Sequence, residues 1–172
     1  DQKSGFDWHL PQQYEMIHKL QPACLIGNNH HQLPYPGEDI QIFERDLPGE
    51  NTFGLSGQAI GHLPLETCET MNTSWGYKIT DNNYKSTEAP LRLLVKAAGK
   101  DANLLLNIGP QPDGCIPDTS IERLKNIGKW LEKNGETIYG TRGGVVPPRD
   151  WGVTTQKDNK IYVHILELQD KA

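Results

Sequence analysis

Residues 103–109 of the sequence read NLLLNIG, and the turn sequence PQPDG follows at 110–114. A short, continuous apolar run closed by Pro and Gly is typical of a strand that is buried on both faces of a parallel sheet. Helical patterns flank this run, one up to about residue 98 and one from residue 118. Such an alternation of helices and buried strands predicts an α/β protein with right-handed crossovers.

The two flanking helices carry sequence signals at their ends. Ser86 or Thr87 can cap the first helix, and Pro90 would then lie in its first turn. Asp118 is expected to cap the second helix, and Gly135 is expected to end it at the C′ position.

The same rhythm continues toward the N-terminus. Apolar spacing predicts a helix over about residues 10–20, and short apolar or alternating runs predict strands at 23–27, 40–44 and 65–71. Residues 45–64 are rich in Gly and Pro and show little periodicity. We therefore expect a long loop there, and long loops in compact domains usually have a function.

The composition changes after about residue 140. Residues 142–150 contain several Gly and Pro and are expected to form a linker. Residues 151–168 alternate around the Asp158-Asn159 pair, which predicts a β-hairpin. Because a lone hairpin is marginally stable, this segment is expected to belong to a second, incomplete β domain.

Composition and charge exclude several classes of protein. The 172 residues contain 17 Lys and Arg against 22 Asp and Glu, which gives a net charge of -5. This mild acidity argues against a nucleic-acid-binding protein. Hydrophobic residues make up 35% of the chain, too many for a disordered protein. No apolar run approaches the ~20 residues of a membrane-spanning helix, so we expect no membrane span.

The residues that often bind metals are not arranged as ligands. Cys24, Cys68 and Cys115 are odd in number and lack CxxC spacing, which predicts neither a disulfide framework nor a zinc site. His30 and His31 are adjacent, so an extended backbone would point them to opposite sides. We expect neither a metal nor an organic cofactor.

Polar side chains follow the predicted strands at their C-terminal ends. These residues are the cluster 28–31, Glu44 and Asn107, and the aromatic residues Trp75 and Tyr77 lie on a nearby turn. In parallel α/β barrels, active-site groups lie at this end of the strands. Carboxylate, amide and imidazole groups beside an aromatic face suit the binding of a sugar.

Four segments resemble one enzyme family. They are LETCETMNTSWGY at 65–77, DNNYKS at 81–86, NLLLNIGPQPDG at 103–114 and NGETIYGT at 134–141. Their sequence and order are similar to those of family 29 glycoside hydrolases, the α-L-fucosidases, over most of residues 6–141. The resemblance implies a catalytic (β/α) barrel followed by a β-sandwich, and retaining hydrolysis of terminal α-L-fucose from fucosylated glycans.

This resemblance implies a specific division of the chain. Residues 1–141 would be the second, C-terminal half of the barrel, 142–150 a linker, and 151–172 the start of the β-sandwich. The family's nucleophile is an Asp followed by Gly on an earlier strand, whereas Asp1 precedes Gln2 and Asp7 precedes Trp8. We therefore expect the nucleophile upstream of this sequence, and residues 1–172 alone to be inactive.

The resemblance also implies roles for individual residues. The family's acid/base Glu ends an Asp-x-x-x-x-Glu stretch, and DIQIFE at 39–44 places it at Glu44. Glu50 in the following loop is the competitor, and we favour Glu44. The family's fucose pocket uses a polar residue in the segment that holds His30 and His31. An aromatic residue at Trp75 is expected to pack on the fucose methyl group.

Each of these residues also has a purely structural interpretation. Glu44 could be solvated or paired with Arg45, and Trp75 could belong to the core. Glu66 and Glu69 flank Cys68, and strand alternation leaves at least one of them facing solvent. The alternative to an enzyme is a non-catalytic homologue that binds fucose or a glycan. The family resemblance suggests a periplasmic, secreted or lysosomal location, although the sequence contains no signal that decides among them.

Overall fold

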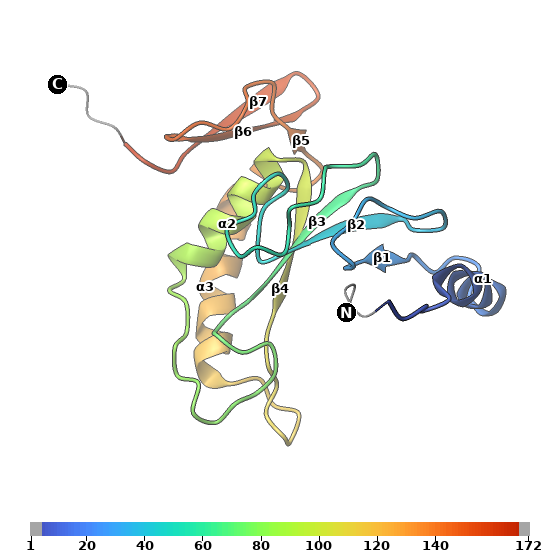
Figure 1. Ribbon diagram of the computed structural model, residues 1–172. Helices are drawn as coiled ribbons and strands as arrows, with labels where there is room; N and C mark the ends of the chain where they lie inside the picture. Colours follow the sequence, from blue (N-terminus) through green and yellow to red (C-terminus); the bar gives the residue numbers. More distant parts are fainter. Residues whose placement is uncertain (1–4, 169–172) are drawn as a thin grey trace.

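The computed structural model of the chain describes residues 5–168 (Figure 1). In chain order its elements are α1 (Leu10–Leu20), β1 (Gly27–Asn28), β2 (Ile40–Glu44), β3 (Leu65–Thr70), α2 (Glu88–Gly99), β4 (Ala102–Asn107), α3 (Asp118–Asn134), the 3-10 helix η1 (Gly135–Thr137), β5 (Arg142–Gly143), β6 (Gly152–Lys157) and β7 (Lys160–Ile165).

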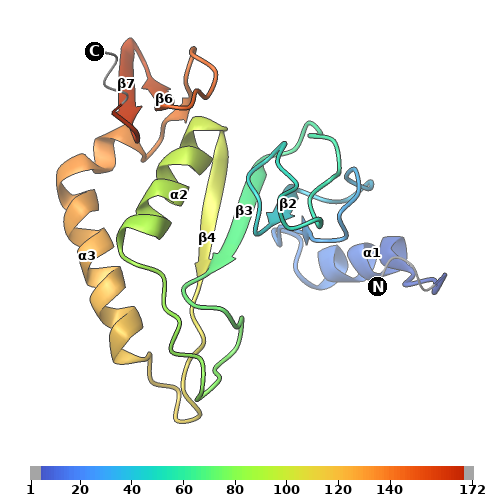
Figure 2. The ribbon, with the colours of Figure 1, turned by 60° about the vertical axis from the view of Figure 1, so that its left-hand side comes forward.

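The first four strands form one parallel sheet in the order β1-β2-β3-β4. In its register Glu44 lies beside Cys68 and Thr70 lies beside Asn107, so the strands end at about the same edge. Figure 2 shows α2 between β4 and α3, with α1 at the far side of the sheet. The parallel α/β class predicted from the sequence is confirmed.

The two faces of this sheet have different surroundings. Gln41 and Phe43 on β2 are fully buried, whereas Ile42 and Glu44 on the opposite face remain partly exposed. A small apolar core lies on the first face, and its buried members are Leu47, Ala97 and Ala102. Since α2 supplies part of this core, the helix covers one face and leaves the other open near the strand ends.

Two predicted strands are less buried than we expected. The strand predicted over 23–27 is reduced to Gly27–Asn28, and Leu25 is 68% exposed. The backbone turns after α1, where the Cys24 amide donates to Gln21, and the Ile26 amide is bound by the Asp39 carboxylate. A strand therefore cannot begin earlier. On β4, Leu105 is 48% exposed because it faces the open side of the sheet.

The helix ends differ from the prediction in detail. Ser86 supplies a cap-like contact, since its hydroxyl accepts from the Ala89 amide at 3.3 Å. Asp118 is the first residue of α3 and makes no side-chain cap hydrogen bond. Gly135 is αR, so it does not form the expected left-handed ending and the chain continues into η1. A Cβ at Gly135 would lie 2.8 Å from the Tyr139 ring, so a larger residue at this position would require the exposed ring to move.

The remaining strands form an antiparallel sheet in the order β5-β6-β7. The predicted hairpin is present as β6 and β7, and Asp158 in its turn has a φ of 53°. The expected linker 142–150 contains the short strand β5, which pairs with β6. A Cβ at Gly99 would lie 2.5 Å from Val153, so α2 and β6 are in close contact. The hairpin is therefore supported by the helix.

The long loop over residues 45–64 is also present, and it is tied to β2. The Asp46 carboxylate accepts from the amides of Thr52 and Phe53. Gln58 donates through Nε2 to the Ile42 carbonyl at 3.1 Å. These contacts fix the loop beside the strand end that carries Glu44.

Candidate active site

A cavity of about 370 Å³ lies on the open face of the parallel sheet near the strand ends. Strands β2, β3 and β4 form its floor, and the loop after β3 forms a wall. Its lining residues are Asn29, Ile42, Glu44, Glu66, Cys68, Trp75, Leu105 and Asn107. The structure therefore brings together Glu44, Trp75 and Asn107, which the sequence singled out separately.

Glu44 is the last residue of β2, and strand alternation turns its side chain toward this cavity. Asn29 donates through Nδ2 to the Glu44 carboxylate at 2.9 Å. Within residues 5–168, no ion pair joins Glu44 to Arg45, although the two are adjacent. Over this part of the chain, the Glu44 carboxylate accepts a hydrogen bond from Asn29 and forms no ion pair.

Glu66 is a second carboxylate in the same cavity, and no sequence pattern singled it out as a site residue. Ile42 lies beside Glu66 in the sheet register, so Glu44 and Glu66 are diagonal neighbours on one face. Burial raises the pKa of Glu66 above its ordinary value. Strand alternation puts Glu66 and Cys68 on the same face of the strand, but the sequence did not reveal which face would line a cavity.

Glu69, by contrast, lies on the covered face and is buried. Its Oε1 atom is 3.4 Å from the Lys85 ammonium group. Strand alternation thus leaves Glu66 partly exposed on the open face, where it lines the cavity, and buries Glu69 beside a lysine.

Cys68 lies on β3, beside Glu44 in the sheet register and two residues after Glu66 on the same face. Burial, followed by the nearby charge of Glu44, raises the pKa of its thiol to about 11. The thiol is therefore protonated near neutral pH and is a poor nucleophile. Cys68 is therefore a small residue of the cavity wall.

Trp75 reaches the cavity from the loop that follows β3. Asn107 donates through Nδ2 to the Trp75 carbonyl at 2.7 Å and to the Thr70 hydroxyl at 3.1 Å. A Cβ at Gly109 would lie 2.7 Å from the backbone of Gly76, so glycine is needed for this close approach. The end of β4 therefore supports the loop that carries the indole.

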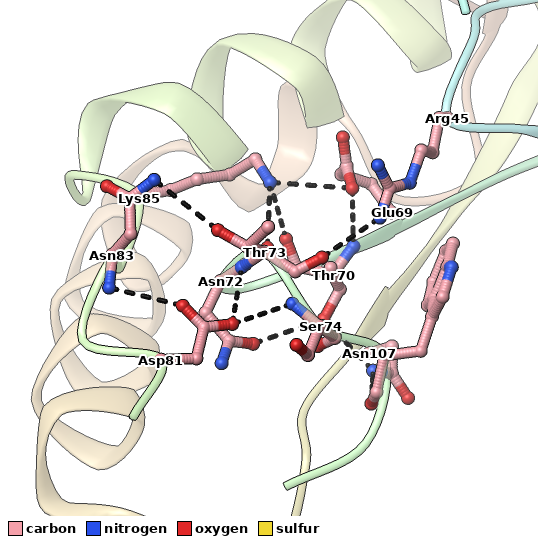
Figure 3. A network of polar contacts seen from close by, with 11 residues as sticks. Arg45, Glu69, Thr70, Asn72, Thr73, Ser74, Asp81, Asn83, Lys85 and Asn107 are labelled. Atoms are coloured by element: carbon pink, nitrogen blue, oxygen red, sulfur yellow. Dashed lines mark hydrogen bonds and ion pairs between the residues drawn. The ribbon is translucent and has the colours of Figure 1, made fainter. Parts of the chain in front are cut away.

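A polar network at the base of the same loop fixes its course (Figure 3). The Asp81 carboxylate accepts from the amides of Thr73 and Ser74 at 3.1 and 2.7 Å. Backbone donation from Ser74 is the main reason that the pKa of Asp81 lies below its ordinary value. Lys85 donates through Nζ to the Thr70 carbonyl at 2.8 Å. The loop is thus held at both its start and its end.

His30 and His31 line a different, neighbouring cavity of about 1150 Å³ between α1 and the loops after β1 and β2. Asn29 lines both cavities. His30 stacks on Tyr35 with ring centroids 4.3 Å apart, and its Nδ1 accepts from the Gln32 amide. Its Nε2 lies 2.8 Å from Glu38. Both ring nitrogens of His30 therefore already have partners.

Glu38 is the centre of a saturated hydrogen-bond cluster. Its carboxylate accepts from the Tyr14 hydroxyl at 2.6 Å and, each at 2.8 Å, from Asn28 Nδ2, His30 Nε2 and the Tyr35 amide. Burial alone would raise the pKa of Glu38, but these hydrogen bonds, led by that from Tyr14, lower it. Burial and the bond to Glu38 raise the pKa of Tyr14 in turn. Sequence reasoning missed this cluster, because its members are scattered over 25 positions.

Glu50, the competitor for the acid/base role, lies away from both cavities. Its Oε1 is 2.9 Å from the Lys100 ammonium group, at the C-terminal end of α2. Tyr77, which was also expected near the site, does not line the cavity that contains Glu44. Neither Glu50 nor Tyr77 therefore lines the cavity that contains Glu44 and Trp75.

Two further features bear on cofactors and membranes. The part of the chain that the structure describes contains no group of three or more His, Cys, Asp or Glu residues placed to hold a metal ion. Over the same residues, no helix is both long and apolar enough to cross a membrane.

Comparison with known proteins identifies the family. The family model described as Alpha-L-fucosidase matches residues 1–136. Plasma alpha-L-fucosidase of Rattus norvegicus is 36% identical over 92% of this chain and 42% of its own length. Tissue alpha-L-fucosidase of the same species is 38% identical over 91% of this chain and 41% of its own length. The chain spans about two fifths of these relatives.

Solved structures show the same relationship. Alpha-L-fucosidase isoenzyme 1 from Paenibacillus thiaminolyticus matches 99% of this chain and 41% of its own, with a TM-score of 0.80 and 34% identity. A Thermotoga maritima alpha-fucosidase in complex with fucose matches 90% and 34%, with a TM-score of 0.67 and 29% identity. These similarities place the chain among the glycoside hydrolases. It belongs to the alpha-L-fucosidase family, family 29.

Proposed function

We propose that the chain is the C-terminal part of a retaining exo-α-L-fucosidase, which removes terminal α-L-fucose from glycans, and that Glu44 is its acid/base. The observation that carries the proposal is the cavity at the strand ends, where Glu44 and Glu66 lie with Trp75. Carboxylates beside an indole suit a sugar whose hydroxyls need acceptors and whose methyl group needs an apolar surface.

The mechanism requires two carboxyl groups about 5 Å apart. We assign the nucleophile to an Asp outside the 172 residues, as the family resemblance implies. That Asp would attack the anomeric carbon while Glu44 transfers its proton to the departing glycosidic oxygen. Glu44 would then remove a proton from water, which displaces the Asp and releases fucose with retained configuration.

The division of the chain follows from the same proposal. Residues 1–141 would form the second half of a (β/α) barrel, 142–150 a connection, and 151–172 the start of a β-sandwich. The four-stranded parallel sheet and the antiparallel hairpin support this division. Residues 1–172 without the rest of the enzyme should release no fucose from an aryl fucoside.

The fucosyl group would occupy the cavity beside Glu44, with its methyl group on Trp75. The fucose complex of the similar Thermotoga maritima protein supports fucose as the ligand. His30 and His31 would border the sugar from the neighbouring cavity, to which Asn29 connects them. Because both His30 nitrogens have partners, any new hydrogen bond from His30 would replace one of these.

The acid/base assignment is tested in the full-length protein by replacing Glu44 with Ala. The acid assists the leaving group, so the variant should lose about 10²- to 10⁴-fold in kcat/KM on natural fucosides. The loss should be far smaller on an aryl fucoside with an activated phenol. Azide, which needs no general base, should restore the second step of the reaction.

Two matched variants give the controls. Glu50→Ala should show neither the substrate-dependent loss nor the rescue by azide, because Glu50 is paired with Lys100 outside the cavity. Glu66→Ala tests the other cavity carboxyl, whose raised pKa also suits an acid, and leaves the same space for azide as Glu44→Ala. If azide rescues Glu66→Ala or Glu50→Ala instead of Glu44→Ala, the assignment to Glu44 is wrong. If the wild-type protein binds L-fucose without hydrolysing any fucoside, the non-catalytic alternative is correct.

A further inference from the structure

Arg45, the residue directly after Glu44, has an unusual backbone conformation. Its φ is 61°, in the left-handed region that residues other than glycine seldom adopt. The Arg45 amide donates to the Cys68 carbonyl at 2.8 Å, which continues the pairing of β2 with β3 for one more step. The backbone therefore turns sharply at the point where the strand carrying Glu44 ends.

The Arg45 side chain reaches the loop that carries Trp75. Its Nη2 donates to the Thr73 carbonyl at 3.0 Å, and Figure 3 shows this side chain beside the start of that loop. The central guanidinium carbon lies 5.4 Å from the Trp75 ring centroid and 5.7 Å from that of Phe53. Both distances are within the range of about 6 Å for cation–π attraction.

Through these contacts Arg45 connects three segments of the chain. It belongs to the end of β2, it lies over Phe53 from the loop 45–64, and it lies over Trp75 from the loop after β3. Among residues 5–168 no carboxylate forms an ion pair with Arg45. Its charge is therefore directed at the two aromatic rings and at a backbone carbonyl.

We propose that Arg45 is a positioning residue, which holds the Trp75 indole as the fucose-contacting wall of the cavity that contains Glu44. This inference rests on the proposed function, because that function gives Trp75 its contact with the sugar. Arg45 acts through Trp75 and does not itself touch the substrate. Its loss should weaken sugar binding and should leave the chemical step nearly unchanged.

The test is a double-mutant cycle in the full-length protein, with Arg45→Gly, Trp75→Ala and the double variant. Glycine suits the positive φ, so Arg45→Gly removes the side chain without adding backbone strain. Loss of one cation–π contact should raise KM for 4-nitrophenyl α-L-fucoside about fivefold, with little change in kcat. The double variant should be no worse than Trp75→Ala, because contacting residues are not additive.

Two more variants complete the set. Arg45→Lys keeps the charge but not the planar group, so its KM should lie between those of wild type and Arg45→Gly. Arg142→Ala removes an exposed arginine of β5 and should match wild type in KM. Thermal unfolding midpoints of all variants should show that the enzyme remains folded.

The cycle is also measured through the Kd of L-fucose, which involves no chemical step. Multiplicative effects of Arg45→Gly and Trp75→Ala, or a wild-type KM and Kd for Arg45→Gly, would overturn the role of Arg45. Non-additive Kd values would support it even if Glu44→Ala failed to show acid/base behaviour, in which case the proposed function alone would fall. Absence of L-fucose binding by the wild type would overturn both.

Discussion

Glu38 and the two carboxylates of the smaller cavity, Glu44 and Glu66, differ in how fully they are hydrogen-bonded. Glu38 accepts four hydrogen bonds, from Tyr14, Asn28, His30 and the backbone of Tyr35. Glu44 accepts from Asn29, and Glu66 has its pKa raised by burial instead of lowered by donors. The difference indicates that Glu38 stabilises the fold, whereas Glu44 and Glu66 keep acceptors available for a ligand.

The largest expected effect on stability comes from Glu38→Ala. The substitution removes one acceptor from four donors, so Tyr14, Asn28 and His30 lose their partner at once. The cost should be about 3 kcal/mol in free energy of unfolding, because buried donors are left unsatisfied. Urea unfolding of the full-length protein at pH 7 measures it. If Glu38→Ala lowered the free energy of unfolding by less than Glu50→Ala does, Glu38 would not have the inferred stabilising role.

Glu38 should also give the wild type a distinctive dependence on pH. Its pKa in the folded state is lowered below the ordinary value of 4.5. The stabilisation is therefore complete above pH 4.5 and is lost as pH falls through the folded-state pKa. Unfolding free energies measured down through pH 4.5 should fall more steeply for wild type than for Glu38→Gln. Parallel curves for the two proteins would contradict this role of Glu38.

The opposite sign is expected for Glu66. A raised folded-state pKa means that stability is lost as pH rises through 4.5 and then through the folded-state value. Glu66→Gln should therefore gain about 0.5 kcal/mol of unfolding free energy at pH 7, a figure reduced for solvent screening. The gain should vanish below pH 4. A loss of stability at pH 7 would show that Glu66 has donors like those of Glu38.

The smallest effect is expected for Glu50→Ala. Its partner Lys100 also donates to the Pro48 carbonyl, and the pair lies near the surface. Such pairs contribute about 0.2–1 kcal/mol, and salt screens them. Urea unfolding at low and at high salt should show a small difference that disappears at high salt. A large loss of unfolding free energy that does not depend on salt would show that Glu50 stabilises the fold as Glu38 does.

The sequence predicted elements whose signals are local. The strand 40–44, the hairpin and the parallel α/β class could be predicted because alternation, turn residues and helix–strand order are local patterns. The strand at 23–27 was overestimated, since the Asp39 side chain and the turn after α1 decide where pairing begins. The Asp39 contact joins residues 13 positions apart, and no periodicity reports either contact.

The candidate site shows the same limit. Glu44 and Trp75 could be selected by residue type and family resemblance, and the structure brings them to one cavity. Glu66 could not be selected, because strand alternation gives two faces without saying which one is open. The partners of His30 were equally hidden, since Glu38 reaches it through a loop whose course has no sequence signature.

Gly109 does not line the cavity, yet its close approach to the Gly76 backbone links this position to the loop that carries Trp75. A side chain at position 109 would meet the Gly76 backbone at 2.7 Å, so the loop that carries Trp75 would have to shift. The course of this loop therefore depends on the size of residue 109, which is not itself a cavity residue. A substitution at Gly109 is therefore a way to change the shape of the pocket from outside it. A list of residues that contact the sugar would not include this position.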